Sequence, residues 1–485
     1  MKKALALVLV VLTLSAGGMC AAVSMLSKQQ DQVEITQISE TGNPAALEGL
    51  EVVLDSCASD SQMHWITTYR PGRTPVVDTL SYYKRFWNED SRYDYLYQDY
   101  YKDQQKRRMV LSYYLHETDY GNVEPENYTG LDLEFLQLEQ STEPGTQSAR
   151  TIAVRDYQPF YHISANFYLT DVEGYVEGYV RGENWKELMA AEDALEEKLN
   201  QFLSIPVQES EKVTIHLAKD TKGEVCDFGI ERQSEDAFQF GVSSDYSLAT
   251  DEAFYFTFNN RTEQGAVVDT SLIPGGYGIY RIPYTVDFDP NKETGILIDQ
   301  ISTVYSIDPS HEVLRLHSSQ DKSKLLLHTL ENGWYVLTVI DRESMTALQR
   351  FEIQEKAPEH DFWKLWEDEE QDIFMVEVDQ SYAFFALQED GSYAQIFLCV
   401  IPTKVHGRSQ YSDMTYDGKR LVVGDVHNWL DTTGTAQGVF YLSVYDFTGL
   451  RYYGEYDTSL NSKIQSSEYN SVRPDTGTPI KLTWT

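Results

Sequence analysis

The feature that most constrains the fold is a strand-turn-strand unit that occurs three times in the C-terminal third of the chain. In the three copies, paired hydrophobic runs flank a polar turn at residues 334–353, 382–400 and 440–456. A further strand-like run precedes each copy, at 324–328, 373–378 and 420–424. Units of three to four strands that recur every ~40–60 residues are typical of β-propeller blades.

The chain before these units also consists mainly of short strand-like runs separated by turns, which favours an all-β body. One segment departs from this pattern. Residues 184–203 are predicted to form an amphipathic helix, since Asn184 and Glu187 fit a capping box and Pro206 would end it. Its apolar face consists of Trp185, Leu188, Leu195, Leu199 and Phe202.

We therefore predict an all-β, β-propeller-like domain over residues 47–485 with one inserted helix. A boundary near 206–210 is the alternative, with an α+β domain before it and a β domain after it. The strand-like end at 479–485 is expected to pair with 47–54, because such pairing closes a propeller and leaves no open edge.

The N-terminal sequence predicts that the body of the protein lies outside the cytoplasm. Lys2 and Lys3 precede residues 4–26, which carry no charged side chain. This length favours an uncleaved membrane anchor within residues 1–27, and 28–46 would form a polar stalk. A cleaved signal peptide and a lipoprotein modified at Cys20 are the alternatives, and each places the body beyond the cytoplasmic membrane.

The charge excludes one class of partner. The chain has 39 Lys and Arg against 76 Asp and Glu, a net charge of −37, and this surface would repel a phosphate backbone. We expect no nucleic-acid partner. The expected partners are the membrane, through the N-terminal segment, and an envelope protein or a glycan.

Cysteine usage indicates neither a metal site nor redox chemistry. The four cysteines are Cys20, Cys57, Cys226 and Cys399, and no CxxC pair occurs. Cys399 is predicted to be a small buried hydrophobic residue, and the same is expected of Cys226. The last three cysteines allow at most one disulfide.

One acidic stretch partly matches a calcium loop. Asp287, Asp289, Asn291 and Glu293 alternate as such loops require, but Lys292 stands where glycine is needed. A solvated acidic turn is therefore the better interpretation. The run 367–370 is likewise expected to be an exposed loop, because its four carboxylates repel one another.

No motif marks a catalytic centre. HExxH and GxSxG are absent, and Ser319 with Lys322 matches SxxK without its partner motifs. The glycines of 273–278 are expected to form a turn between strands. His64 and His162 lie in strand-like runs and are predicted to be packed or hydrogen-bonded rather than to bind a metal. His311 and His317 are six positions apart, a spacing that does not form a helical zinc-peptidase motif.

Taken together, the Lys-Lys-apolar start, the acidic tyrosine-rich body and the blade-like hairpins resemble uncharacterised membrane-anchored surface proteins of Gram-positive-type bacteria with propeller-like ectodomains. The resemblance rests on no specific motif and implies no catalytic residues. The predicted function is a non-enzymatic binding or sensing ectodomain without a cofactor or metal. The alternative is a carbohydrate-active enzyme with two catalytic carboxylates, which the sequence does not identify.

Overall fold

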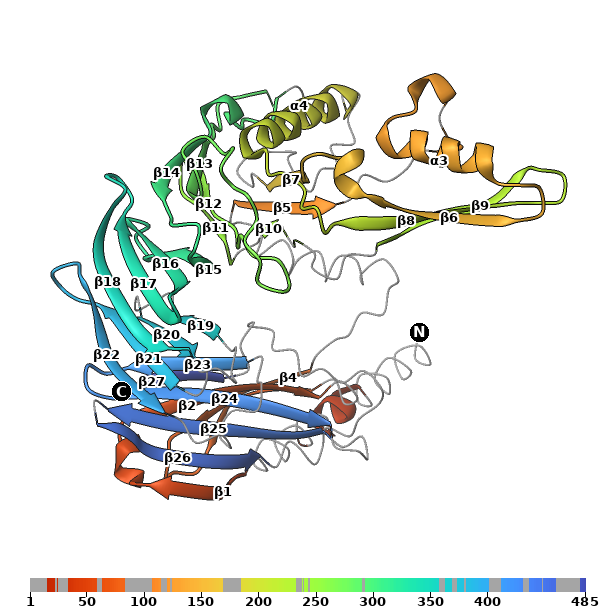
Figure 1. Ribbon diagram of the computed structural model, residues 1–485. Coiled ribbons are helices and arrows are strands. Elements are labelled where there is room, and N and C mark those ends of the chain that lie inside the picture. Colours follow the sequence, from red (N-terminus) through yellow and green to blue (C-terminus); the bar gives the residue numbers. More distant parts are fainter. Residues whose placement is uncertain are drawn as a thin grey trace, which may run out of the picture. The chain divides into compact units, whose positions relative to one another are not determined.

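The structure is a computed structural model that describes most of the chain. The described residues are 15–21, 24, 34–58, 63–82, 107–114, 120–122, 124–168, 185–232, 238, 240–242, 245–289, 293–356, 363–368, 373–378, 381–400, 411–430, 436–446, 448–458 and 480–485. They are predominantly β, and neighbouring strands run antiparallel, in several sheets as meanders (Figure 1). The all-β prediction is confirmed at this level.

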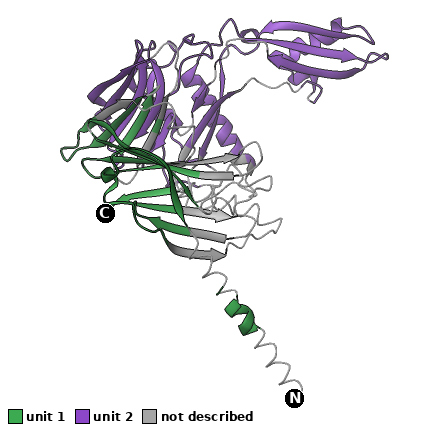
Figure 2. Cartoon of the chain, turned by 90° about the horizontal axis from the view of Figure 1, so that it is seen from below, with its two compact units in different colours: residues 1–92, 358–485 green, residues 93–357 purple. Residues whose placement is uncertain are grey.

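The chain divides into two compact units, each described here by itself (Figure 2). Unit 1 joins residues 1–92 to 358–485, and unit 2 is residues 93–357. The predicted single domain over 47–485 remains a prediction, as does a boundary near 206–210, which would fall inside unit 2.

The described residues of unit 1 form three sheets, with the orders β1-β26-β25-β24-β23, β27-β2-β3-β4 and β19-β20-β21-β22. Its elements are β1 Ile35–Gly42, η1 Pro44–Leu47, β2 Leu50–Ala58, β3 Met63–Tyr69, β4 Val76–Tyr82, β19 Trp363–Asp368, β20 Ile373–Val378, β21 Ser381–Leu387, β22 Tyr393–Val400, β23 Tyr411–Tyr416, β24 Leu421–Leu430, β25 Ala436–Asp446, β26 Gly449–Thr458 and β27 Ile480–Trp484.

In unit 2, the residues that the structure describes form four sheets, with the orders β10-β5-β7, β6-β8-β9, β11-β12-β13-β14 and β15-β16-β17-β18. Its strands are β5 Arg108–Tyr114, β6 Gln147–Ala153, β7 His162–Tyr168, β8 Lys212–Lys219, β9 Val225–Arg232, β10 Gly241–Val242, β11 Ser247–Ala249, β12 Ala253–Phe256, β13 Gly278–Pro283, β14 Ser302–Ser306, β15 Glu312–Ser318, β16 Lys324–Glu331, β17 Trp334–Asp341 and β18 Thr346–Glu355. Its helices are η2 Pro125–Asn127, α3 Gly130–Ser141, η3 Val154–Asp156, α4 Trp185–Leu203 and η4 Ile298–Gln300.

The three repeated units are confirmed as sheets. Each copy, together with the run that precedes it, supplies the last three strands of a four-stranded meander: β15–β18, β19–β22 and β23–β26. The apolar runs form these strands because they are buried. In β16, for example, the five residues from Leu325 to Thr329 are all buried, as expected for a strand covered on both faces.

In each of these three sheets, the hairpin between the third and the fourth strand contains the same arrangement of side-chain hydrogen bonds. One carboxylate oxygen of an aspartate accepts hydrogen bonds from both the backbone N–H and the hydroxyl of a nearby Ser or Thr. The distances to the N–H and to the hydroxyl are 2.8 and 2.6 Å for Asp341 with Ser344, 2.9 and 2.6 Å for Asp390 with Ser392, and 2.8 and 2.5 Å for Asp446 with Thr448. Such Asx-type bonds fix a tight turn.

In unit 1 the ends of the chain exchange strands. The C-terminal β27 pairs with β2, from Leu50 opposite Trp484 to Leu54 opposite Ile480, and this confirms the predicted pairing of the two segments. In return, the N-terminal β1 pairs with β26, from Ile35 opposite Thr458 to Gly42 opposite Tyr452.

The predicted polar stalk over 28–46 is therefore wrong for its second part. Residues 35–42 form β1, and 44–47 form a short helix whose Asn43 side chain accepts a bond from the N–H of Ala45. The polar side chains that suggested a stalk are exposed on an edge strand. Backbone pairing with β26 holds this strand, together with side-chain hydrogen bonds from Gln37 to Tyr452 and from Ser39 to Glu455.

The predicted helix over 184–203 is confirmed as α4 of unit 2. Leu195 and Leu199 are buried, whereas Asp193 and Glu197 are exposed, so the helix is amphipathic as expected. The proposed cap, Asn184, lies outside the described residues.

Helix α4 also covers an open sheet edge. The Asn200 amide exchanges two hydrogen bonds of 2.8 Å with the backbone of Ile163 in β7, and Glu196 accepts the N–H of Ala165 at 3.1 Å. Two polar residues one turn apart thus replace a neighbouring strand along β7, which protects the edge from pairing with another chain.

A second helix, α3, was not identified from the sequence. Its Asp132 carboxylate accepts the backbone N–H and the hydroxyl of Thr129, and Leu131, Phe135 and Leu138 are buried. The described residues therefore depart from the prediction of one inserted helix.

Most of the predicted anchor, residues 4–26, lies outside the described residues, apart from 15–21 and 24. Within the described part of the chain, no helix has the length and apolar character needed to cross a membrane.

The exchanged strand gives a first prediction. Leu482 of β27 is 4% exposed and belongs to the core that β27 shares with β2 and β24–β26. We expect Leu482→Ala to lower the free energy of unfolding by about 2–5 kcal/mol, since it removes buried methyl groups and leaves a cavity. Urea unfolding followed by tryptophan fluorescence measures this change.

Thr483→Ala, at the exposed neighbouring position of the same strand, is the matched control and should change stability little. Equal stability of Leu482→Ala and the Thr483 control would mean that β27 contributes nothing to unit 1.

Candidate functional site

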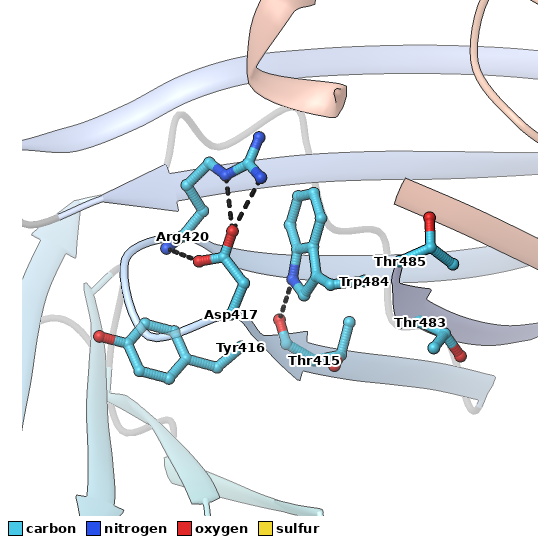
Figure 3. A pocket seen from close by; sticks show the side chains of 7 residues that line it. All are labelled: Thr415, Tyr416, Asp417, Arg420, Thr483, Trp484 and Thr485. Carbon is cyan, nitrogen blue, oxygen red and sulfur yellow. Dashed lines mark hydrogen bonds and ion pairs between the residues drawn. The ribbon is translucent and has the colours of Figure 1, made fainter. Parts of the chain in front are cut away.

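Unit 1 has an open pocket where β23 and β27 end and the β23–β24 turn begins (Figure 3). Its lining residues are Thr415, Tyr416, Asp417, Arg420, Thr483, Trp484 and Thr485. An indole, a carboxylate, a guanidinium and several hydroxyls thus surround one hollow.

Arg420 organises this pocket. Its guanidinium donates to Asp417 Oδ2 at 2.9 Å, and also to the carbonyl oxygens of Ala46 and Glu48 at 2.9 and 3.0 Å. The guanidinium carbon lies 4.2 Å from the centroid of the Trp484 ring, and the indole N–H donates to the Thr415 carbonyl at 3.2 Å. The indole is therefore held in a fixed orientation.

Asp417 remains ionised in this setting. Burial alone would raise the pKa of its carboxyl, but hydrogen bonds from the backbone of Arg420 and Lys419, together with the Arg420 side chain, lower the pKa below its usual value. A pocket with a fixed aromatic ring and both charged and neutral hydrogen-bonding groups is suited to a polyhydroxylated ligand. The same contacts also hold β27 in place, so the pocket has a structural role.

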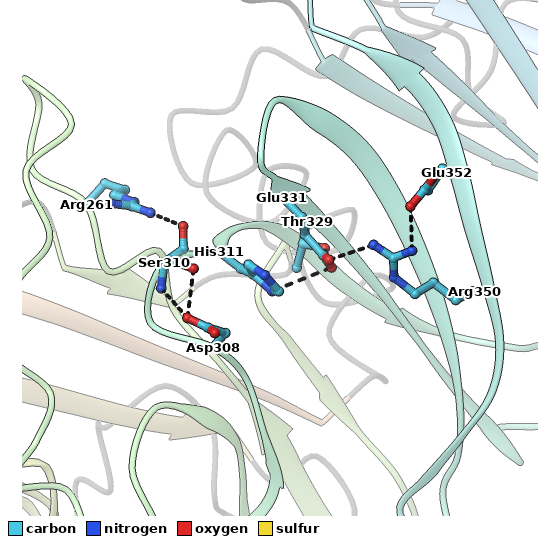
Figure 4. A network of polar contacts seen from close by, with 8 residues as sticks. All are labelled: Arg261, Asp308, Ser310, His311, Thr329, Glu331, Arg350 and Glu352. Atoms are coloured by element: carbon cyan, nitrogen blue, oxygen red, sulfur yellow. Dashed lines mark hydrogen bonds and ion pairs between the residues drawn. The ribbon is translucent and has the colours of Figure 1, made fainter.

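Unit 2 contains a second polar site, centred on Glu331 at the end of β16 (Figure 4). The Glu331 carboxylate accepts hydrogen bonds from the Thr329 hydroxyl at 2.7 Å and from Arg350 at 2.8 Å. His311 Nδ1 lies 3.6 Å from Glu331 Oε1, and Arg350 also pairs with Glu352 at 2.8 Å.

The loop that carries His311 is clamped by three consecutive side chains. Asn259 donates to Glu312 Oε1 at 3.1 Å, Asn260 donates to the Pro309 carbonyl at 2.8 Å, and Arg261 donates to the Ser310 carbonyl. Asp308 accepts both the N–H and the hydroxyl of Ser310 within the same turn. These bonds fix the position from which His311 faces Glu331 (Figure 4).

The chemistry of this second site follows from its charges. Burial would raise the pKa of Glu331, but the bonds from Thr329 and Arg350 and the nearby His311 lower it, so the carboxylate is ionised near neutral pH. An ionised carboxylate beside an imidazole can orient the ring and stabilise its protonated form, as a general base requires. The pKa values of the Asp417 and Asp446 carboxyl groups are likewise lowered rather than raised.

The sequence pair Ser319 and Lys322 is not brought together as a nucleophile and its base. The Ser319 hydroxyl donates to Asp321 at 2.7 Å, and the Lys322 ammonium donates to the Ala249 carbonyl at 3.0 Å. Both residues belong to the turn between β15 and β16.

The other predicted positions have structural settings. His162 is hydrogen-bonded to Glu196 at 2.8 Å, as expected, whereas the side chain of His64 lies outside the described residues. Gly275 and Gly276 adopt φ values of +81° and +80°, and they form the predicted turn before β13.

The acidic stretches and cysteines are only partly described. Asp287 and Asp289 are exposed, and 290–292 lie outside the described residues. The run 367–370 is not all loop, because Glu367 and Asp368 end β19 and 369–370 are not described. Cys226 is exposed rather than buried, since its position on β9 faces solvent, and the side chains of Cys57 and Cys399 lie outside the described residues.

His317 forms a buried pair that its spacing from His311 did not reveal. Its Nε2 lies 2.9 Å from His328 Nε2 on the neighbouring strand, with the rings 5.0 Å apart and nearly parallel. His328 is fully buried, and burial followed by the nearby His317 and Arg315 lowers its pKa well below the usual value. Among the described residues, no group of three or more His, Cys, Asp or Glu is arranged to hold a metal ion.

The residues of both sites were missed by the sequence analysis, apart from His311. Trp484 had one available signal, its place at the end of a terminal strand predicted to pair. Glu331 and Arg350 are 19 positions apart and meet through the register of β16, β17 and β18, which a single sequence does not reveal.

Comparisons with known proteins leave the family open. No family model matches the sequence, and no curated protein matches it significantly. The periplasmic gluconolactonase of Pseudomonas aeruginosa is 10% identical, with a TM-score of 0.28 over 89% of this chain and 98% of that chain.

Two further solved structures are similar at the same level. A Bacteroides fragilis protein assigned provisionally as a 6-phosphogluconolactonase is 10% identical, with a TM-score of 0.28 over 84% of this chain and 94% of its own. A hypothetical selenium-binding protein of Sulfolobus tokodaii is 12% identical, with a TM-score of 0.27 over 85% and 92%. At these scores, the likenesses carry no conclusion about the chemistry of this chain.

The histidine pair predicts a pH dependence. His328 stays neutral in the folded protein but titrates near pH 6.5 when unfolded, so the unfolded state binds more protons below that pH. Stability should therefore be full above about pH 7 and fall by up to about 2 kcal/mol by pH 5. Urea unfolding at pH 7.5 and pH 5 tests this in the natural protein and in His328→Leu.

The His328→Leu variant should lose part of that pH dependence, whereas His216→Leu, at a half-exposed histidine, should retain it. An unchanged pH dependence in His328→Leu would contradict the assignment.

Proposed function

We propose that the protein is an extracytoplasmic, membrane-tethered β-propeller-like protein that binds a carbohydrate at the Trp484 pocket. The observation that carries the proposal is the fixed indole of Trp484 beside the Asp417–Arg420 pair and the hydroxyls of Thr483 and Thr485. The membrane tether and the location outside the cytoplasm rest on residues 1–27 of the sequence.

The propeller arrangement is supported by how the meanders meet within unit 1. The edge strand β23 of one sheet lies against β27, the edge strand of another. Asp413 of β23 accepts the backbone N–H of Leu482 at 2.5 Å. Exchange of terminal strands between sheets is the kind of closure that a ring of blades needs.

The chemistry of the pocket supports a sugar more than an ion or an apolar ligand. Asp417 and Arg420 neutralise each other, so the pocket offers both acceptors and donors without a net charge. Hydroxyl groups of a sugar can use both, and the apolar face of its ring can pack on the indole.

Substitution of Trp484 tests the binding proposal. We expect Trp484→Leu to weaken carbohydrate binding at least about tenfold, because a buried aromatic residue commonly contributes more than ~1.4 kcal/mol to binding. A glycan array identifies the ligand, and calorimetry measures its affinity.

Trp334→Leu is the matched control, since this indole is 38% exposed at the start of β17 and lies outside the pocket. Circular dichroism checks that both variants fold. Equal affinity of the two variants, or no binding of any glycan by the natural chain, would refute the proposed site.

Carbohydrate-related hydrolysis is the second candidate function. The specific observation in its favour is His311 beside the ionised Glu331, with Arg350 available to stabilise negative charge. A sugar lactone is the first substrate to test, because its hydrolysis needs a general base to activate water and a positive group to stabilise the oxyanion that forms. In this hydrolytic mechanism, a histidine oriented by one carboxylate takes the place of the two catalytic carboxylates expected from the sequence.

Substitution of His311 tests the hydrolytic version. We expect the natural chain to accelerate hydrolysis of gluconolactone, and His311→Asn to reduce kcat by about 10²–10⁴-fold, because the general base is lost. Proton release followed by a pH indicator measures the rate.

The control is His216→Asn, which removes another histidine near a carboxylate, since His216 Nε2 lies 3.9 Å from Asp227. A natural chain without activity, or equal rates in the two variants, would exclude this function for His311.

A further inference from the structure

Unit 2 contains a fully buried carboxylate that neither candidate function uses. Glu211, directly before β8, is 0% exposed. Arg232 at the end of β9 donates to both of its oxygens at 3.2 Å, and the backbone N–H of Phe238 donates to Oε1 at 3.1 Å. The Tyr161 hydroxyl, at 3.3 Å, is also directed at Oε1.

The two carboxylate oxygens are used unequally. Oε1 receives three neighbouring donors, whereas within the described part of unit 2 Oε2 receives one, from Arg232. A buried carboxylate oxygen has room for two hydrogen bonds, so Oε2 retains an acceptor position.

Two further tyrosines bring buried hydroxyls to this carboxylate. The hydroxyl oxygens of Tyr113 and Tyr157 are buried and have no hydrogen-bond partner among the described residues. Burial and then the charge of Glu211 raise the pKa of Tyr157 to about 12, and the same two causes raise the pKa of Tyr113 further. Both phenols therefore stay protonated. The geometry also places both tyrosines beside Glu211: the Tyr113 ring centroid lies 5.6 Å from the guanidinium carbon of Arg232, and Tyr157 donates its N–H to Val154, whose own N–H donates to the Glu211 carbonyl.

Buried hydroxyls without a partner are rare in folded proteins, because each costs the free energy of a lost hydrogen bond. The charges restrict what can satisfy them. An anion would be repelled by Glu211 and a cation by Arg232, whereas a neutral molecule that donates and accepts meets neither penalty.

We propose that Glu211, Tyr113 and Tyr157 form the binding site of an internal water molecule. The water donates to Glu211 Oε2 and accepts from a tyrosine hydroxyl, and its remaining hydrogen bond is to the other hydroxyl. Such waters typically make about three hydrogen bonds to buried polar groups, as this cluster offers.

The site joins segments that are distant in the sequence. Tyr113 lies on β5 next to its last residue, Tyr157 follows η3, and Glu211 and Arg232 flank the β8–β9 hairpin. The water would thus connect the sheet β10-β5-β7 to the sheet β6-β8-β9 through polar contacts.

Removal of one hydroxyl tests the proposal by the sign of its effect. If Tyr157 binds the water, Tyr157→Phe increases the equilibrium constant of unfolding about fivefold, the usual effect of losing one hydrogen bond. If the hydroxyl is unsatisfied, the same variant leaves this constant unchanged or decreases it, which would overturn the proposal. Tyr113→Phe should behave like Tyr157→Phe.

Tyr128→Phe, at a half-buried tyrosine of unit 2 outside the cluster, corrects for the loss of a hydroxyl as such. A crystal structure of the full chain gives the direct test. Density for a water at about 2.7–3.2 Å from Glu211 Oε2 and from one of the two hydroxyls supports the site, and a dry cluster rejects it.

Discussion

The exchange of terminal strands is the constraint on which unit 1 depends. Strand β27 comes from the end of the chain but completes the sheet of β2–β4, while β1 comes from near its start and completes the sheet of β23–β26. The apolar residues of both terminal regions therefore share one core, in which Val52, Leu442 and Ile480 are fully buried. The two regions bury these residues against each other, so their pairing stabilises the unit.

Polar contacts supply what the hydrophobic core does not specify. The core of each unit only requires that apolar faces meet, but the position of a turn or an edge needs directed bonds. Asp446 fixes the last hairpin, Asn200 covers the edge of β7, and Glu211 connects segments of unit 2. Arg420 has the same role for β27, and the pocket beside Trp484 is a result of that arrangement.

The sequence was sufficient to predict the elements whose signal is local. The three meanders and α4 were found because their hydrophobic residues recur at the period of a strand or a helix. Helix α3 was missed because apolar residues such as Leu131 and Leu133 alternate with polar ones in its sequence, much as in a strand. In the structure Leu131 and Phe135 are buried, whereas Leu133 is exposed. Strand β1 was missed because its side chains are mostly exposed and polar, so the sequence lacks the apolar alternation of a half-buried strand.

The candidate sites were less predictable, since they depend on tertiary contacts. His311 meets Glu331 across a loop and a strand, and Arg350 reaches Glu331 from a third segment. Nothing in the local pattern distinguishes these residues from the many other charged side chains of an acidic chain. The tyrosines around Glu211, Tyr113 and Tyr157, could not be identified from the sequence either, because tyrosine is abundant throughout it.

The discontinuity of unit 1 also affects the order in which the protein acquires structure during its synthesis. Strands β1 and β2 are synthesised before residues 93–357, whereas their partners β26 and β27 follow only after that segment has been made. During that interval the early strands expose unpaired edges, which are prone to aggregate, while unit 2 can already complete its own core. Chaperones that shield the early strands would therefore matter more for the yield of this protein than for one whose domains are continuous in sequence.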